Sequence, residues 1–236
     1  MYTRSMRPSL LDRLYPPTCI LCGAPGAEGR DLCPGCHEEL PWNRHACARC
    51  ALPFDGPVPP GALCGPCRKA PPPFDGCVAP LRYELQVPAL VTSAKFRGKL
   101  NAARLLGQIL AAALESASWD LPDALVPVPL HPKRLRARGY NQALEIARIL
   151  GDDLGLPLET SLCQRVTATP PQAGLDERER HRNIRGAFAV RGPLAGARIA
   201  IVDDVVTTAS TVIELSRVLR RAGAGSLLVL TVSRTP

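Results

Sequence analysis

Apolar runs mark the expected strands in the C-terminal part of the chain. Runs at 123–130, 187–190, 197–204 and 226–234 predict four strands. The runs at 197–204 and 226–234 are almost unbroken, as in strands covered on both faces of a sheet. We therefore expect these two strands to be buried.

Segments with helical patterning separate these runs. Residues 88–116 predict two helices that break near Gly98, and the spacing of apolar residues at 140–155 predicts a third. A further helix follows the third apolar run, with Ser210 as its N-cap and Gly223 as its C-cap. Strands that alternate with helices predict an α/β fold, a parallel sheet flanked by helices, in which ligands bind beyond the carboxyl ends of the strands.

The N-terminal part has a different pattern, dominated by cysteine, proline and glycine. Eight of the 10 cysteines form four Cys-x-x-Cys pairs before residue 70. Two such pairs bring four thiolates around one tetrahedral ion, so this part predicts a small cysteine-rich zinc-ribbon domain with two structural Zn²⁺ sites. Sequential pairing of the Cys-x-x-Cys turns is the simplest arrangement, and an interleaved one also fits. The predicted ligands are Cys19, Cys22, Cys33, Cys36, Cys47, Cys50, Cys64 and Cys67.

A disulfide framework is the alternative use of these cysteines. It requires an oxidising compartment, whereas charged residues interrupt the N-terminus before an apolar signal-peptide core can form. We therefore favour zinc and expect a cytoplasmic protein. Sites made of four thiolates leave no coordination position for water, so the metal is expected to stabilise the fold and not to catalyse.

The change of pattern also predicts the domain organisation. Residues 1–70 are expected to form a double zinc ribbon, and residues 81–236 are expected to form the α/β domain. The segment RKAPPPFDG at 68–76 is rich in proline, which favours a stiff, extended backbone. Residues 71–80 are therefore expected to be a linker.

Composition and charge add a weak indication of the partner. The formal net charge of +8 favours an anionic partner, such as nucleic acid or a phosphorylated metabolite. The longest uncharged apolar-rich stretch, at 105–114, is far shorter than the roughly 20 residues that span a bilayer. No membrane insertion is expected.

The strongest candidate for chemistry is the segment IAIVDDVVTTAST at 199–211. Asp203 and Asp204 follow an apolar run on the ligand side of a parallel sheet, where carboxylates can accept hydrogen bonds from vicinal hydroxyls. The turn at 207–211 leads into a helix whose N-terminal amides and dipole favour an anion. A phosphorylated ribose fits both halves of the motif. The predicted phosphate-binding residues are Thr207, Thr208, Ala209, Ser210 and Thr211.

This segment resembles the phosphoribosyl diphosphate (PRPP) signature of type I phosphoribosyltransferases. The resemblance implies that Asp203 and Asp204 hold the ribose hydroxyls as the catalytic pair, and that 207–211 bind the 5-phosphate. Ala209 stands where this loop very often has glycine. The resemblance also implies that Mg²⁺ binds with PRPP, and that a diphosphate loop lies near Arg138 at Val128, Pro129 and Leu130.

A narrower resemblance, to the ComF family, covers nearly the whole chain. The segments AKFRGK (94–99), PVPLHPKRLRARGYNQA (127–143) and ERERHRNIRGAF (177–188) resemble parts of that family, which joins a zinc ribbon to a phosphoribosyltransferase domain. The resemblance implies an association with competence and DNA uptake or with nucleotide metabolism. Type I transferases also have a mobile hood over the substrate, and residues 166–184 resemble it.

Two functional hypotheses follow. In the first, the chain transfers a phosphoribosyl group to an unidentified acceptor, and the two aspartates orient the ribose while diphosphate leaves. In the second, the chain is a non-catalytic module that senses PRPP or a nucleotide and binds DNA or a competence-machinery protein through its ribbon and basic surface. Both hypotheses require PRPP or a related phosphorylated ribose in the same pocket, and only the first requires the release of diphosphate.

Overall fold

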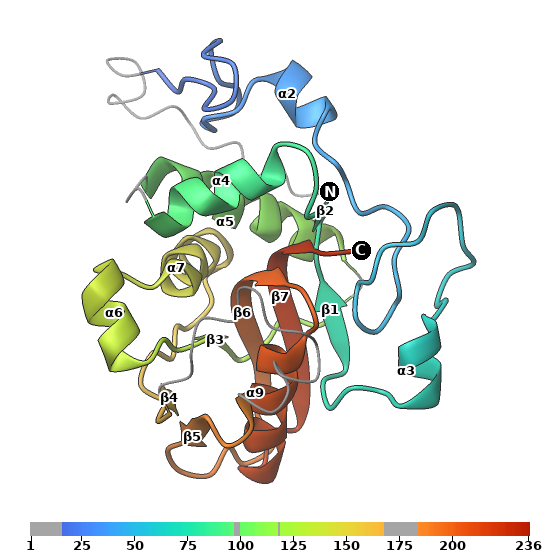
Figure 1. The fold of residues 1–236 in the computed structure, drawn as a ribbon, viewed down its shortest axis with the longest axis vertical. Coiled ribbons are helices and arrows are strands. Elements are labelled where there is room, and N and C mark those ends of the chain that lie inside the picture. Colours follow the sequence, from blue (N-terminus) through green and yellow to red (C-terminus); the bar gives the residue numbers. More distant parts are fainter. Residues whose placement is uncertain (1–15, 97–99, 118, 168–183) are drawn as a thin grey trace.

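The computed structural model describes residues 16–96, 100–117, 119–167 and 184–236 (Figure 1). A parallel sheet of five strands lies at its centre, in the order β1-β7-β6-β3, and β2 pairs with β7 next to β1. All of these pairings are parallel, so the predicted parallel sheet is confirmed. The strands are β1 (Gly76–Val78), β2 (Leu81–Arg82), β3 (Ala124–Pro127), β6 (Arg198–Val206) and β7 (Ser226–Arg234).

Helices cover both faces of this sheet. Ile199 and Ile201 of β6 belong to one buried core, and Ala200 and Val202 belong to the other, because successive side chains of a strand point to opposite faces. The first core lies under α9 (Ser210–Arg221), and the second lies under α4 (Val87–Phe96), α5 (Leu100–Ser116) and α7 (Gln142–Leu154). Among the described residues, no helix combines the length and the apolar character needed to cross a bilayer.

Three shorter elements complete the α/β part. Helix α6 (Pro132–Arg138) follows β3, and strands β4 (Cys163–Arg165) and β5 (Phe188–Val190) pair antiparallel with each other. The apolar run at 187–190 therefore forms a strand as predicted, but in this two-stranded sheet and not in the central one.

The predicted caps of α9 are each wrong by one residue. Ala209, and not Ser210, is the N-cap, with a left-handed conformation (φ 59°, ψ 4°). The Ser210 hydroxyl instead shares a 2.7 Å hydrogen bond with the hydroxyl of Thr208. At the other end Ala222 is the C-cap, and Gly223 follows it with a φ of 96°. The left-handed turn at Ala209 therefore starts the helix at Ser210, one residue earlier than a side-chain cap at Ser210 would allow.

The cysteine-rich region packs against both layers of helices. It contains two helices of five residues, α2 (Pro34–Glu38) and α3 (Gly65–Lys69), which Figure 1 shows at separate places on the molecule. Cys19 belongs to the core under α4, α5 and α7, whereas Cys47 and Cys67 belong to the core under α9. The region thus contributes to the cores on the two opposite faces of the sheet.

Residues 71–80, the expected linker, contribute a strand to the sheet. Strand β1 lies within this segment and pairs with residues 228–230 of β7. Just before it, Phe74 is only 1% exposed, and the carboxylate of Asp75 accepts a 2.8 Å hydrogen bond from the backbone N–H of Leu227. In the structure this segment is part of the α/β core.

Candidate functional site

The paired aspartates lie near the carboxyl end of β6, which continues through Val205 to Val206. Asp203 is half-buried, whereas Asp204 is only 5% exposed. The backbone N–H of Asp204 donates to Oδ1 of Asp203 at 2.9 Å, which orients that carboxylate relative to the strand. The two acids therefore have different environments: Asp203 borders the cavity described next, and Asp204 is largely covered.

A small cavity lies between the end of β6 and the start of α9. Its volume is about 40 Å³, and it is lined by Asp203 and by residues 205–212. Ala209 has no side-chain hydrogen bond as N-cap, and the first turn of α9 contains no acidic residue. The positive end of a helix of 12 residues thus faces a cavity bordered by hydroxyl side chains, an arrangement that favours a bound anion. The predicted loop at 207–211 is therefore a turn followed by a helix start.

The predicted diphosphate loop lies beside the end of β6. Strand β3 pairs with β6, and the backbone N–H of Val128 donates to the carbonyl of Val202 at 2.9 Å, so Val128 is adjacent to the aspartates. Pro129 and Leu130 follow and are half-buried. The Asn141 side chain donates to the carbonyl of Val128 at 3.0 Å and thereby holds the loop.

Arg138 lies close enough to Asp204 for their charges to interact. Burial lowers the pKa of Arg138, the charge of Arg134 lowers it further, and the Asp204 carboxylate has the opposite effect. Nη1 of Arg138 donates to Oε1 of Gln142 at 2.6 Å, which fixes the guanidinium at the start of α7. The structure therefore brings together the two aspartates, the segment predicted to bind diphosphate and this arginine.

Sequence analysis missed a second arginine at the site. Arg165 of β4 is 8% exposed and lies with its guanidinium carbon 5.7 Å from the centre of the Phe188 ring. Burial and the charge of Arg134 lower its pKa, whereas the Asp203 carboxylate raises it. A single arginine in a three-residue strand has no motif around it, so only the fold reveals its proximity to Asp203.

The eight predicted zinc ligands gather into two groups, and the pairing is sequential. Within each group the four sulfur atoms lie within 4.8 Å of one another. We call the first group cluster 1 and the second group cluster 2. Four thiolates at this separation fit the tetrahedral coordination of Zn²⁺. Cluster 1 is Cys19, Cys22, Cys33 and Cys36, and cluster 2 is Cys47, Cys50, Cys64 and Cys67.

Backbone amides favour the thiolate form of one cysteine in each cluster. Burial raises the pKa of Cys19, but N–H groups of Cys33, Cys22 and Leu21 outweigh it and lower the pKa to about 6. In cluster 2, burial acts against the N–H groups of Cys64, Cys50 and Arg49, and the pKa of Cys47 falls to about 7. Donation of backbone N–H groups to sulfur is the support that a metal-bound thiolate needs.

The remaining sequence predictions are only partly covered by the structure. Cys163 is buried outside the clusters, and burial raises the pKa of its thiol to about 12, as expected for a small apolar filler. The expected hood at 166–184 lies largely outside the described residues.

Comparisons with known proteins identify the family. Residues 10–68 match the model of the double zinc ribbon domain. The chain is 37% identical to the DNA utilization protein YhgH of Salmonella typhi over 225 residues, which are 93% of this chain and 98% of that protein. It is 31% identical to Competence protein F of Haemophilus influenzae over 224 residues, 92% of this chain and 96% of that protein.

The solved structures that resemble the chain include a purine phosphoribosyltransferase from Pyrococcus horikoshii. The two share 18% identity and a TM-score of 0.34, over 56% of this chain and 71% of that chain. The two sequence relatives, by contrast, exceed 30% identity over nearly their whole lengths. The N-terminal residues match a double zinc ribbon, and nearly the whole chain is similar to these two relatives. The chain therefore belongs to the ComF family, together with YhgH and Competence protein F.

Proposed function

We propose that the chain binds PRPP together with Mg²⁺ at the carboxyl end of β6, and that it transfers the phosphoribosyl group to an acceptor. The observation that carries this proposal is the left-handed turn at Ala209, which opens the positive end of α9 beside a half-buried aspartate. A single anion would need only the helix start. The adjacent carboxylates favour a ligand that has hydroxyl groups next to its phosphate.

The 5-phosphate is proposed to bind at the start of α9. The backbone N–H groups of its first turn and the hydroxyls of Thr208, Ser210 and Thr211 provide the donors. The Asp203 carboxylate accepts hydrogen bonds from the ribose hydroxyls at the edge of the cavity. Asp204 is mostly covered, so its role is to balance the charge of Arg138 and to orient the strand end.

The diphosphate is proposed to lie over the loop at 128–130, within the positive field of Arg138 and Arg165. Oxygen ligands are what Mg²⁺ prefers, and the carboxylate of Asp203 with the diphosphate oxygens would hold it. Bound there, the ion supplies charge neutralisation to the diphosphate leaving group. The bond between the anomeric carbon and the diphosphate oxygen breaks, and the acceptor forms the new bond at that carbon. The Asp203 carboxylate offsets the positive charge that develops on the ribose.

Ligand-dependent thermal stabilisation tests this proposal. With PRPP at about 100 times its Kd, the stabilisation is about 2.7 kcal/mol, or about 5–10 °C in Tm for a chain of this size. Asp203→Asn is expected to lose most of this shift. Asp152→Asn is the matched control, because Asp152 is exposed on α7 away from the cavity, and it should keep the full shift. No shift in the wild-type protein with PRPP and MgCl₂ would refute the proposal.

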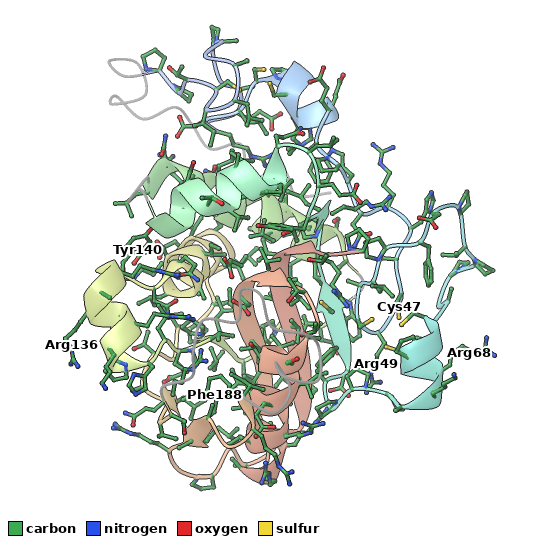
Figure 2. The ribbon with its side chains drawn as sticks, viewed as in Figure 1. Cys47, Arg49, Arg68, Arg136, Tyr140 and Phe188 are labelled. Carbon is green, nitrogen blue, oxygen red and sulfur yellow. The ribbon has the colours of Figure 1, made fainter. Side chains whose placement is uncertain are left out.

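The alternative, a PRPP-sensing module that binds DNA or a competence partner, is favoured by the basic surface of α6. Lys133 and Arg136 are exposed there, and Figure 2 shows Arg136 directed away from the helix. The names of the relatives, a DNA utilization protein and a competence protein, point in the same direction. Stabilisation by PRPP without diphosphate release across a panel of bases and amines would support this alternative. Binding of single-stranded DNA through phosphate contacts should weaken between roughly 50 and 200 mM salt. An affinity that stays constant over this range would count against DNA binding.

A further inference from the structure

A buried arginine joins cluster 2 to the start of the phosphate loop. Arg234, the last residue of β7, is 8% exposed. Its Nη1 atom donates to the carbonyl of Val206 at 3.0 Å and also to the carbonyl of Thr207. Its Nε atom donates to the carbonyl of Cys50, a cluster 2 ligand, at 3.3 Å. One guanidinium thus binds the backbone of the zinc site and the backbone on which the phosphate loop begins.

A second set of contacts joins the same cysteine turn to the other end of α9. Nη2 of Arg49 lies 3.8 Å from Oδ1 of Asp75, and the other oxygen of Asp75 pairs with Arg220 in the last turn of α9. Nη1 of Arg220 also donates to the carbonyl of Gly225 at 2.6 Å. Figure 2 shows Cys47 and Arg49 beside α3 on the side of the molecule where β1 lies. The turn between Cys47 and Cys50 is therefore connected to both ends of α9.

The apolar contacts follow the same division. Cluster 2 shares one core with Val206, Ala209 and Val212, which line the cavity. Cys19 of cluster 1 belongs to the core on the opposite face of the sheet, with α4, α5 and α7. The two metal sites are chemically alike, yet Val206, Ala209 and Val212 belong to the core that contains cluster 2, whereas Val205 packs against the core that contains Cys19.

We propose that Arg234 is a positioning residue that couples zinc at cluster 2 to the phosphate loop. Zinc fixes the backbone from Cys47 to Cys50, the carbonyl of Cys50 orients Arg234, and Arg234 holds the carbonyls of residues 206 and 207. The amides that follow are then oriented before the ligand arrives, which lowers the entropy cost of binding. This inference rests on the proposed PRPP site. It predicts that loss of zinc from cluster 2 weakens PRPP binding, whereas loss of zinc from cluster 1 does not.

Two matched variants test this coupling. Cys67→Ser and Cys36→Ser each remove the last ligand of one cluster, and each ligand lies in one of the two five-residue helices, α3 and α2. Metal analysis should find one zinc per chain in both variants. By calorimetry with PRPP and MgCl₂, we expect Cys67→Ser to lower the affinity at least about fivefold, the lower end of the range for coupled sites. Cys36→Ser should change it by less than about twofold.

Substitution of the arginine separates coupling from general damage to the metal site. Arg234→Met leaves all eight cysteines in place, so two zinc ions per chain should remain while the PRPP affinity falls as in Cys67→Ser. Arg234→Lys keeps the charge and should recover part of the affinity. If Arg234→Met binds PRPP like the wild type with both ions present, the coupling is refuted.

Amide hydrogen exchange separates this inference from the proposed function. Faster exchange at 205–213 in Cys67→Ser, but not in Cys36→Ser, supports the coupling without any ligand. If the wild-type chain does not bind PRPP at all, the proposed function fails, and the exchange comparison alone decides the coupling. Equal exchange at 205–213 in the two variants would then overturn it.

Discussion

Ala209 offers a direct test of the geometry of the proposed phosphate loop. Its left-handed conformation costs an L-residue about 1–2 kcal/mol, a cost that glycine avoids. Glycine has a greater conformational entropy in the unfolded chain than alanine, which lowers the free energy of unfolding by about 0.4–1 kcal/mol. Ala209→Gly also removes a methyl group that is 8% exposed, worth about 0.8 kcal/mol. Because these terms nearly cancel, we expect Ala209→Gly to change the free energy of unfolding by less than about 1 kcal/mol.

Ala209→Val is expected to behave very differently. A β-branched side chain is poorly tolerated at positive φ, so the variant should lose about 1–3 kcal/mol of stability. For a chain of this size that loss lowers Tm by about 2–4 °C per kcal/mol. The added carbon atoms also enter a cavity of only about 40 Å³. We therefore expect Ala209→Val to lose the Tm increase that the proposed function predicts with PRPP.

Ala195 provides the control for the backbone effect. It also has a positive φ, 46°, but it is exposed and precedes the opposite end of β6. Ala195→Val should destabilise the protein and keep the PRPP response, and Ala195→Gly should stabilise it, because no buried methyl is lost. Scanning calorimetry with and without PRPP and MgCl₂ measures both effects. If Ala209→Val matches the wild type in Tm and in PRPP response, the left-handed turn does not exist and the loop geometry is wrong.

Three further predictions concern stability and metal content. A Cβ atom at Gly107 of α5 would lie 2.7 Å from Cβ of Ile149 on α7. Gly107→Ala should therefore lower the free energy of unfolding in urea by about 1–2 kcal/mol, even after a gain of about 1 kcal/mol in helix propensity. An unchanged midpoint would contradict the close packing of α5 on α7. Cys22 of cluster 1 is exposed, whereas all four ligands of cluster 2 are buried. EDTA should therefore release zinc from cluster 1 first, and a zinc-sensitive dye should show two phases of release. A single phase would contradict this order. The Arg198 guanidinium lowers the pKa of Asp123, so their pairing stabilises the fold above the unfolded pKa of about 3.9 and this stabilisation is lost as the pH falls below it. Asp123→Asn should therefore lose less stability than the wild type between pH 6 and 3 in urea titrations, and identical losses would argue against the pairing.

Periodic features were the predictable part of this fold. Strands β6 and β7 follow apolar runs long enough to identify them without tertiary information. The two clusters follow from Cys-x-x-Cys spacing, although only the fold distinguishes sequential from interleaved pairing. The acidic pair and the hydroxyl-rich turn are contiguous in sequence, so the candidate site was found as one motif.

Features that depend on distant segments were not predictable. Strands β1 and β2 have only three and two residues, and the proline residues before them favour a linker. An alanine in a left-handed N-cap is uncommon, so Ser210 was the better local candidate for that position. Arg165 and Arg234 are isolated arginines in strands, and their partners are visible only after the chain has folded.

The bond between Arg234 and the carbonyl of Cys50 spans 184 residues, which has a consequence for the nascent chain. At about 5–20 residues per second, translation takes about 10–40 s to travel from one to the other. Strand β7, which pairs with both β1 and β6, also comes last among the strands in the sequence. During that interval β1 and β2, in the first half of the chain, lack the strand β7 with which they pair. The thiols of cluster 2 are not yet covered by all of the residues that bury them in the folded chain. Early capture of zinc would protect those thiols from oxidation during synthesis.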